Sequence, residues 1–389
     1  MNAKNEIGTV ETQFFPIAEK GESLRLHGGE ISGPARLAYE TYGALNGARD
    51  NAILVFHAMT GSQHAAGYNK SVPGAENLWT DECQVGWWDE FIGPGKALDT
   101  ERFFVLCINY LGGCYGSTGP ASTNPKTGKP HGSAFPRISI SDIVDAQMKL
   151  VDHFRIPRLH AVVGGSIGGL MCLNLATRYP DRARTIIPIA SGLGVTSLQR
   201  ILTFEQICAI ECDPNFRGGD YYNSKKRPER GLALARMISH KTFISLQTLQ
   251  HRARTEIAQP AEGLAWYQLT SSLESYMLHQ GNKFVQRFDA NTYLRIAEAW
   301  QRFSLTDGLG VKKPEEAFAP CKHQQYLIFS VNSDVCFYPD EQEEMELVLK
   351  KAGVPNMRIT VHSDKGHDSF LIEPDLYTPH LVYALQGKL

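Results

Sequence analysis

The sequence predicts an α/β fold in which a mostly parallel central sheet is flanked by helices, and three observations support this prediction. Short apolar runs recur along the chain, segments with the spacing of amphipathic helices separate several of them, and one long stretch contains few strand-like runs. Strands buried on both faces of a parallel sheet form continuous apolar runs. Alternation of such strands with helices is typical of a sheet covered on both sides.

The strands and helices can be placed from these patterns. Strands are predicted at 52–56, 102–108, 160–163, 185–190, 326–331 and 357–361. Ser141 is predicted to cap a helix over 142–154, whose apolar residues are spaced for one buried face. A second helix is predicted over 167–179, ending before Pro180, and Pro339 is predicted to open a third through 340–352.

The stretch 192–320 differs from its surroundings because it is rich in helix-forming residues. We predict that it forms a helical lid inserted before the last strands. The expected organisation is a core over 1–191, the lid over 192–320 and the rest of the core over 321–389. The segment 110–138 is crowded with Gly, Pro, Ser and Asn, and so long a loop is typically functional.

The composition is that of an ordinary soluble globular protein, with 42% apolar and 21% charged residues among 389. It excludes a disordered chain and a collagen-like repeat. The 39 basic and 41 acidic residues nearly balance, which provides no electrostatic attraction to nucleic acid or to an anionic membrane. We therefore expect small-molecule partners, with no nucleic acid and no membrane.

The location is predicted from the N-terminus and the cysteines. The first 20 residues lack the apolar segment of a signal peptide, and no apolar run approaches the ~18–20 residues that span a bilayer. The eight cysteines are scattered, and Cys107 and Cys172 lie in apolar runs, as buried thiols do in a reducing compartment. We expect a cytoplasmic protein.

A candidate nucleophile lies in the sequence Gly164-Gly165-Ser166-Ile167-Gly168, which matches GxSxG. The motif directly follows a predicted strand and directly precedes a predicted helix, the setting of a nucleophile elbow. Small flanking residues are needed there because strand and helix approach closely. The alternative is a tight glycine turn whose serine has no function.

A serine at an elbow needs a base and an acid, which follow it in the order acid, then histidine. Asp334 comes after the predicted strand 326–331, and His367 follows the strand 357–361. We predict a Ser166–His367–Asp334 triad. His362, in contrast, is expected to be a solvated surface residue.

The oxyanion hole is expected to use the backbone N–H of Ile167 and a second N–H from the loop 57–62, for which Met59 is the candidate. A metal site is the competing class of site. Cys208 and Cys212, like His362 and His367, lack the spacing of known zinc frames, so none is predicted.

The motifs of the chain resemble those of the homoserine O-acetyltransferase family, α/β-hydrolase-fold acyltransferases of methionine biosynthesis. The resemblance rests on HAMTGSQHAAG (57–67), GWWDEFIGPGKALDT (86–100), NYLGGCYGSTGPASTNPKTGKPHG (109–132), GGSIGGL (164–170), GLALARMI (231–238), NSDVCFYP (332–339) and GHDSFL (366–371). It implies the α/β-hydrolase fold. It also implies a homodimer formed through lid helices.

The resemblance further implies a ping-pong reaction without a permanently bound cofactor. Ser166 would take the acetyl group from acetyl-CoA, with His367 as base, and L-homoserine would then accept it. Arg236 and Asp368 match the family's positions for binding the acceptor's carboxylate and ammonium groups. An Arg side chain can bind a carboxylate bidentately.

The residues leave several alternatives open. The donor could be succinyl-CoA, the acceptor could be serine, and a hydrolase or a catalytically inactive binding protein could share the fold. The basic run Lys225, Lys226, Arg227 and Arg230 could meet the phosphates of CoA or form a solvated helix end. The segment 68–85 is longer than in compact relatives and could alter the entrance to the site.

Overall fold

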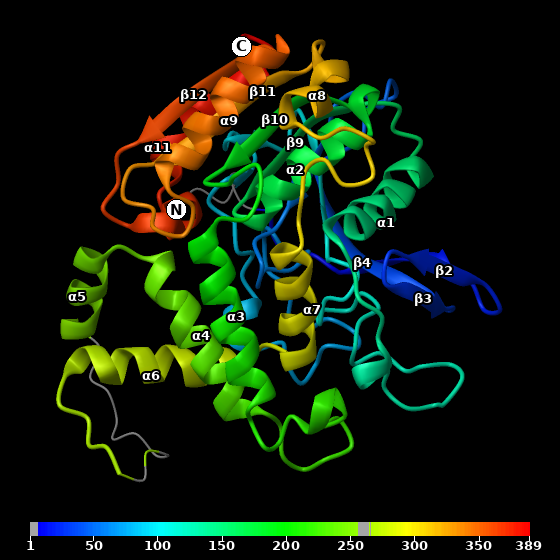
Figure 1. Cartoon of the computed structure of the whole chain (residues 1–389). Helices are drawn as coiled ribbons and strands as arrows, with labels where there is room; N and C mark the ends of the chain where they lie inside the picture. The colour runs from blue at the N-terminus through cyan, green and yellow to red at the C-terminus, as the bar shows by residue number, and fades with distance from the viewer. Residues whose placement is uncertain (1–6, 256–263, 265) are drawn as a thin grey trace.

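The computed structural model describes residues 7–255, 264 and 266–389, and an eight-stranded sheet forms its centre (Figure 1). The strand order is β1-β4-β8-β5-β9-β10-β11-β12. From β8 to β12 the strands pair in parallel, whereas β1–β4 and β4–β8 are antiparallel. The predicted α/β class is confirmed. The strands are β1 (Gln13–Ala18), β4 (Ala35–Tyr42), β5 (Ala52–Phe56), β8 (Phe104–Ile108), β9 (Leu159–Gly165), β10 (Ala183–Ile189), β11 (Gln325–Val331) and β12 (Asn356–Val361).

The apolar runs form strands because both faces of the sheet are covered. Leu54 and Phe56 of β5 pack into one core cluster, while Ile53 and Val55 pack into a second cluster on the opposite face. All five residues of β5 are buried. The predicted strand 102–108 was too long at its start, since β8 begins at Phe104.

The N-terminal strands were not predicted. β1 includes a proline and exposed positions, and β4 carries Glu40 in its middle. That carboxylate is fully buried and accepts hydrogen bonds from Thr12, Tyr42, His64 and Asn69. A charged residue can be buried inside a strand when hydrogen-bond donors satisfy its carboxylate oxygens. Two further pairs, β2 (Ser23–Leu26) with β3 (Gly29–Ser32) and β6 (Ile92–Gly93) with β7 (Leu98–Asp99), lie outside the main sheet.

Helices α1 (Ile140–His153), α2 (Ile167–Arg178) and α9 (Pro339–Ala352) bury apolar residues in the first cluster, and α11 (Pro374–Leu385) buries its own in the second. The predicted cap of α1 was wrong. Ser139 caps the helix by accepting from the Asp142 N–H at 3.1 Å, and Asp142 closes a capping box. Ser141 lies within the helix and accepts a hydrogen bond from Asn174.

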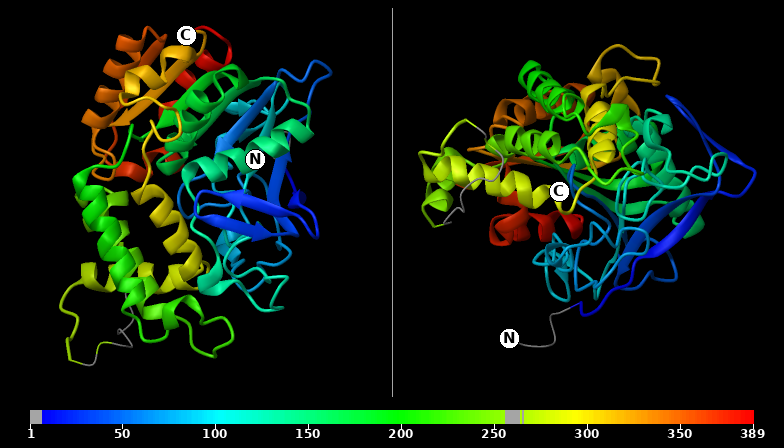
Figure 2. Two further views of the ribbon diagram at one scale, coloured as in Figure 1. Left: turned by 45° about the vertical axis from the view of Figure 1, so that its right-hand side comes forward. Right: turned by 90° about the horizontal axis from the view of Figure 1, so that it is seen from below.

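Between β10 and β11 the described residues form helices and no strand. These are α3 (Ser197–Glu211), α4 (Glu229–Phe243), α5 (Leu246–Thr255), α6 (Ser272–Val285), α7 (Ala290–Gln301) and α8 (Pro314–Ala317). Helices α3 to α7 lie together at one end of the molecule (Figures 1 and 2). We call α3–α7 the lid, and the boundaries at 191 and 320 stay a prediction.

No helix in the described parts of the chain is long and apolar enough to cross a membrane.

Candidate active site

Ser166 stands at a sharp turn between the end of β9 and the start of α2. Its backbone angles, φ 60° and ψ −128°, are strained for a residue with a side chain. The turn is held by the Ser166 N–H, which donates to the Ile189 carbonyl at 2.9 Å. This is the geometry of a nucleophile elbow.

The glycines around Ser166 are required by close backbone contact. A Cβ on Gly164 would lie 2.5 Å from the backbone of Gly168. A Cβ on Gly168 would in turn lie 2.5 Å from the Phe56 carbonyl oxygen, at the end of β5. Strand β9, helix α2 and strand β5 can therefore meet only where side chains are absent.

Asp334 and His367 are brought together after the ends of β11 and β12, although they lie 33 positions apart in the sequence. The Nδ1 of His367 lies 2.7 Å from Oδ2 of Asp334. The other oxygen of Asp334 accepts from the backbone N–H groups of Cys336 (2.7 Å) and Phe337 (3.0 Å), which fixes the carboxylate. Both side chains are buried.

The Nδ1 of His367 donates to the carboxylate, so its Nε2 is left as the free ring nitrogen. No described residue makes a hydrogen bond to Nε2. His367 and Ser166 both line the same cavity. Burial lowers the pKa of His367, but the charges of Asp334 and Asp368 outweigh it and the pKa is raised.

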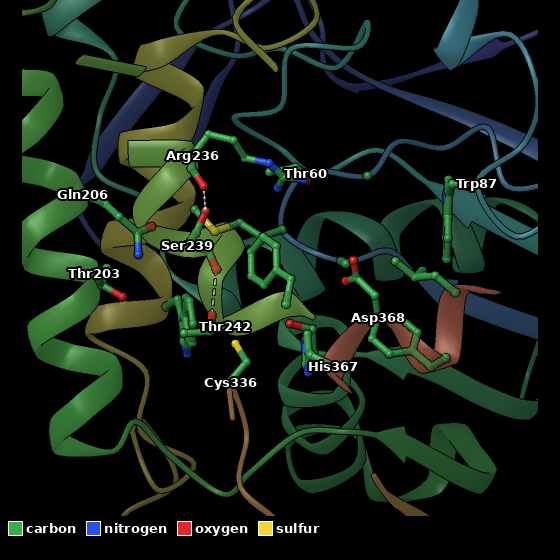
Figure 3. Close-up of a pocket in the computed structure, with 18 of the residues that line it drawn as sticks. Thr60, Trp87, Thr203, Gln206, Arg236, Ser239, Thr242, Cys336, His367 and Asp368 are labelled. Carbon is green, nitrogen blue, oxygen red and sulfur yellow. Dashed lines mark hydrogen bonds between the residues drawn. The ribbon is translucent and has the colours of Figure 1, made fainter. Parts of the chain in front are cut away.

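The cavity has a volume of about 330 Å³ and lies between the sheet-forming part and the lid. Ser166, His367, Asp368 and Met59 line it from one side, and Arg236 of α4 from the other. Figure 3 shows Arg236, His367 and Asp368 around this space. Five of the seven predicted site residues thus line one cavity. The other two are Asp334, which contacts His367, and Ile167, which directly follows Ser166.

The loop after β5 brings Met59 to the cavity wall, and its turn is closed by the Gly61 N–H, which donates to the Ala58 carbonyl. Ile167 is the first residue of α2. The first N–H groups of a helix have no intrahelical acceptor, so that of Ile167 is available beside Ser166. A developing negative charge is stabilised at such a helix start.

Arg236 is held by aromatic rings. Its guanidinium carbon lies 5.0 Å from the ring centre of Phe243 and 4.9 Å from that of Phe284. Burial and the nearby charge of Arg287 lower the pKa of Arg236 to about 10, against the opposing effect of Asp368. The side chain therefore remains protonated at neutral pH, and its Nε has no partner among the described residues.

Asp368 directly follows His367 and faces the same cavity. Burial raises the pKa of this carboxyl above its ordinary value, although the charges of His367 and Arg236 oppose the shift. Arg236 and Asp368 thus place one basic and one acidic side chain in the cavity of the nucleophile, which Arg287 and Glu82 also line. An amino acid carries the complementary pair of charges.

Other predicted features lie elsewhere. The basic run Lys225, Lys226, Arg227 and Arg230 does not line the cavity. His362 is exposed. No cluster of metal-ligating side chains occurs in the described residues. In the segment 68–85, Glu82, Cys83 and Val85 do line the cavity.

The sequence did not single out Arg287 and Glu341. Arg287 lines the cavity from the connection just after α6, and no motif marks it in the sequence. Glu341 belongs to the first turn of α9, where an acidic residue is ordinary, and its burial became visible only in the fold.

Comparison with known proteins defines the family. Residues 51–374 match the model of the alpha/beta hydrolase fold. The homoserine O-acetyltransferase of Mesorhizobium japonicum is 43% identical over 358 residues, which are 91% of this chain and 88% of that protein. The homoserine O-acetyltransferase of Solidesulfovibrio magneticus is 41% identical over 369 residues, covering 94% and 90% of the two chains. The chain belongs to the homoserine O-acetyltransferase family.

Solved structures agree with this assignment. Homoserine O-acetyltransferase from Bacillus anthracis superposes with a TM-score of 0.84 at 26% identity, covering 97% of this chain and 98% of that one. Esterase E22 gives the same TM-score and identity and covers 97% and 100%. The same architecture therefore occurs in a protein named as an esterase. The fold by itself does not determine whether the acyl acceptor is water or another molecule.

Proposed function

We propose that this protein transfers the acetyl group of acetyl-CoA to the hydroxyl of L-homoserine through an acetyl-Ser166 intermediate, as a step of methionine biosynthesis. The observation that carries the proposal is the presence of Arg236 and Asp368 in the cavity of Ser166 and His367. Membership of the homoserine O-acetyltransferase family supports it.

In the first half-reaction His367 Nε2 takes the proton of the Ser166 hydroxyl as its oxygen attacks the thioester carbonyl carbon. The N–H groups of Met59 and Ile167 would stabilise the resulting oxyanion. The carbon–sulfur bond then breaks and the CoA sulfur leaves with the proton from His367. Asp334 holds the imidazole and balances its charge.

In the second half-reaction the homoserine hydroxyl attacks the ester of Ser166 and gives its proton to His367. The Ser166 oxygen leaves and takes that proton back, so the enzyme is regenerated. Arg236 would bind the carboxylate of the acceptor and Asp368 its ammonium group. No permanently bound cofactor takes part in either step.

Hydrolysis is the second candidate, and the similarity to esterase E22 favours it. A hydrolase would let water attack acetyl-Ser166. A cation–anion pair for an amino acid has no use in that reaction, so the cavity favours the transferase. A succinyl donor and a serine acceptor are tested in the same experiment.

The experiment follows the mass of the intact protein after mixing with acetyl-CoA or succinyl-CoA, with a chase of homoserine, serine or buffer. We expect one acetyl group, absent in Ser166→Ala, that leaves rapidly only with homoserine. Equally rapid loss in buffer would establish a hydrolase. If no adduct accumulates, release of free thiol from the donor distinguishes rapid turnover from no reaction.

The proposal includes a homodimer formed through the lid. Ile201 and Phe204 of α3 are 55% and 61% exposed, which is unusual for apolar side chains so close together. Light scattering of the wild type and of Phe204→Glu tests this.

A cytoplasmic location is also proposed, because a reducing compartment suits the eight free cysteines.

A further inference from the structure

The end of α6 contacts three separate loops beside the cavity, and we call this set of contacts the lid seam. The Nη1 of Arg287 donates to the Thr60 carbonyl at 3.3 Å. The hydroxyl of Tyr115 donates to the backbone carbonyl of Arg287, and Lys283 forms an ion pair with Glu82. The lid is therefore joined to the loop after β5, to the segment 110–138 and to the segment 68–85.

Arg287 is the member of the seam that reaches the site. It lines the cavity, and its guanidinium carbon lies 5.1 Å from the ring centre of Phe284, the same ring that contacts Arg236 at 4.9 Å. Burial lowers the pKa of Arg287, but Tyr115 and Cys83 outweigh this effect and raise it. Arg287 therefore keeps its charge.

The carbonyl that Arg287 contacts belongs to the loop 57–62, which is expected to supply the Met59 N–H to the oxyanion hole. Thr60 follows Met59, and the turn is closed by the hydrogen bond from the Gly61 N–H to the Ala58 carbonyl at 3.0 Å. The Thr60–Gly61 peptide carries both this carbonyl and the Gly61 N–H, and the Ala58–Met59 peptide carries both the accepting Ala58 carbonyl and the Met59 N–H. Rotation of the Thr60–Gly61 peptide would therefore break the hydrogen bond that fixes the direction of the Met59 N–H. A charged donor on the Thr60 carbonyl opposes that rotation more strongly than a neutral one.

We propose that Arg287 is a positioning residue that holds the turn Ala58–Gly61 so that the Met59 N–H points at the oxyanion. The inference rests on the proposed function in one respect, namely that the reaction passes through acetyl-Ser166. Both half-reactions form an oxyanion at the same place. Loss of the Arg287 contact therefore slows both by the same factor, whereas loss of an acceptor-binding group slows only the second.

The test compares full-length Arg287→Met and Arg287→Lys with the wild type. Rapid quench and intact mass give the rate of Ser166 acetylation by acetyl-CoA, and the chase gives the rate of transfer to homoserine. For Arg287→Met we expect both rates to fall about 10- to 100-fold, with the KM for homoserine nearly unchanged. Arg287→Lys can still donate to the Thr60 carbonyl and should recover part of both rates.

Lys283→Met is the matched control, because it removes a cation from the seam that does not contact the turn. It should leave both rates near those of the wild type. Melting temperatures are measured for every variant. If Arg287→Met does not fold, Arg287→Lys and Arg287→Gln are compared instead, and a larger loss of both rates in the glutamine variant supports the proposal.

Two results would overturn the inference. A rise in the KM for homoserine with normal acetylation would make Arg287 an acceptor-binding residue. A lower melting temperature with normal rates would make it a structural contact only. Failure of the proposed function is distinguishable, because p-nitrophenyl acetate can acetylate Ser166 and report on Arg287 even if the wild type does not transfer to homoserine.

Discussion

The predicted triad and Arg236, the lid residue proposed to bind the acceptor, are held in different ways. Ser166, Asp334 and His367 follow strands β9, β11 and β12, and backbone hydrogen bonds or close backbone contact fix the serine and the aspartate. Arg236 lies on a lid helix, where the faces of Phe243 and Phe284 hold it instead. Its backbone belongs to a helix that packs mainly on other lid helices.

The two kinds of support suit two different roles, namely positioning the reacting groups and selecting what fits the cavity. Strand ends in one sheet share a rigid frame, which suits groups that must meet the reacting atoms within fractions of an ångström. A lid helix supplies side chains that define what fits the cavity. Changes at the strand ends should therefore affect both half-reactions, and a change at Arg236 should affect mainly the second.

Asp334→Asn should have the largest effect. An amide cannot hold the imidazole in the required tautomer, and kcat should fall by about 10⁴-fold in a folded protein. The Asp334 charge also raises the pKa of His367. Activity needs the neutral imidazole, so the acid limb of the kcat/KM profile should move to lower pH. Turnover near that of the wild type would remove Asp334 from the triad.

Gly168→Ala tests the rigid frame itself. The added methyl group would lie 2.5 Å from the Phe56 carbonyl oxygen and 3.0 Å from that of His57, and neither backbone atom can rotate away. We expect a lower melting temperature and a kcat lower by about 100-fold in both half-reactions. Gly194→Ala is the control, because a Cβ there meets nothing within 4 Å. Equal behaviour of the two variants would contradict the close-packing argument.

Arg236→Ala tests the lid. The loss of a charged partner for the acceptor's carboxylate should slow transfer to homoserine by about 10- to 100-fold and raise its KM. Acetylation of Ser166 should change little. Lys241→Ala, an exposed position on the same helix, controls for effects on α4 as a whole. If both half-reactions slow equally, Arg236 does not bind the acceptor.

Glu341→Gln should have the smallest effect. Burial raises the pKa of this carboxyl to about 7, against hydrogen bonds from the Tyr338 N–H and the Gln199 amide. When ionised it raises the pKa of His367. The substitution should move the acid limb to lower pH by less than about one pH unit, with kcat nearly unchanged. A shift to higher pH would contradict the assigned sign.

The inner strands could be predicted well because each is a continuous apolar run, and the edge strand β12 could be predicted from its β-branched residues although only Val361 is buried there. β5 has the predicted bounds, and β11 and β12 each begin one residue earlier than predicted. β1 and β4 could not be predicted in this way. Glu40 interrupts the apolar pattern of β4, and its burial depends on Thr12 and Asn69, which lie far from it in sequence.

Residues of the candidate active site could be predicted where they lie in a known motif or directly follow a predicted strand. Ser166 lies in a motif, and Asp334 and His367 follow strands in the expected order, so chain order alone was informative. Arg287 follows no motif. Its contact with Thr60 spans 227 residues, and nothing local in the sequence encodes such a contact.

Elements that depend on neighbours in the chain could be predicted from the sequence: the apolar strands, the helices among the described residues between β10 and β11, and the small residues around Ser166. The periodicity of apolar residues and the placement of glycines involve only a few neighbouring residues, so both can be recognised in the sequence before the fold is known. Three-dimensional packing establishes which distant groups share the cavity, which carboxylates are buried and that Arg287 contacts the Thr60 carbonyl. Those properties depend on packing between segments that the chain order leaves free.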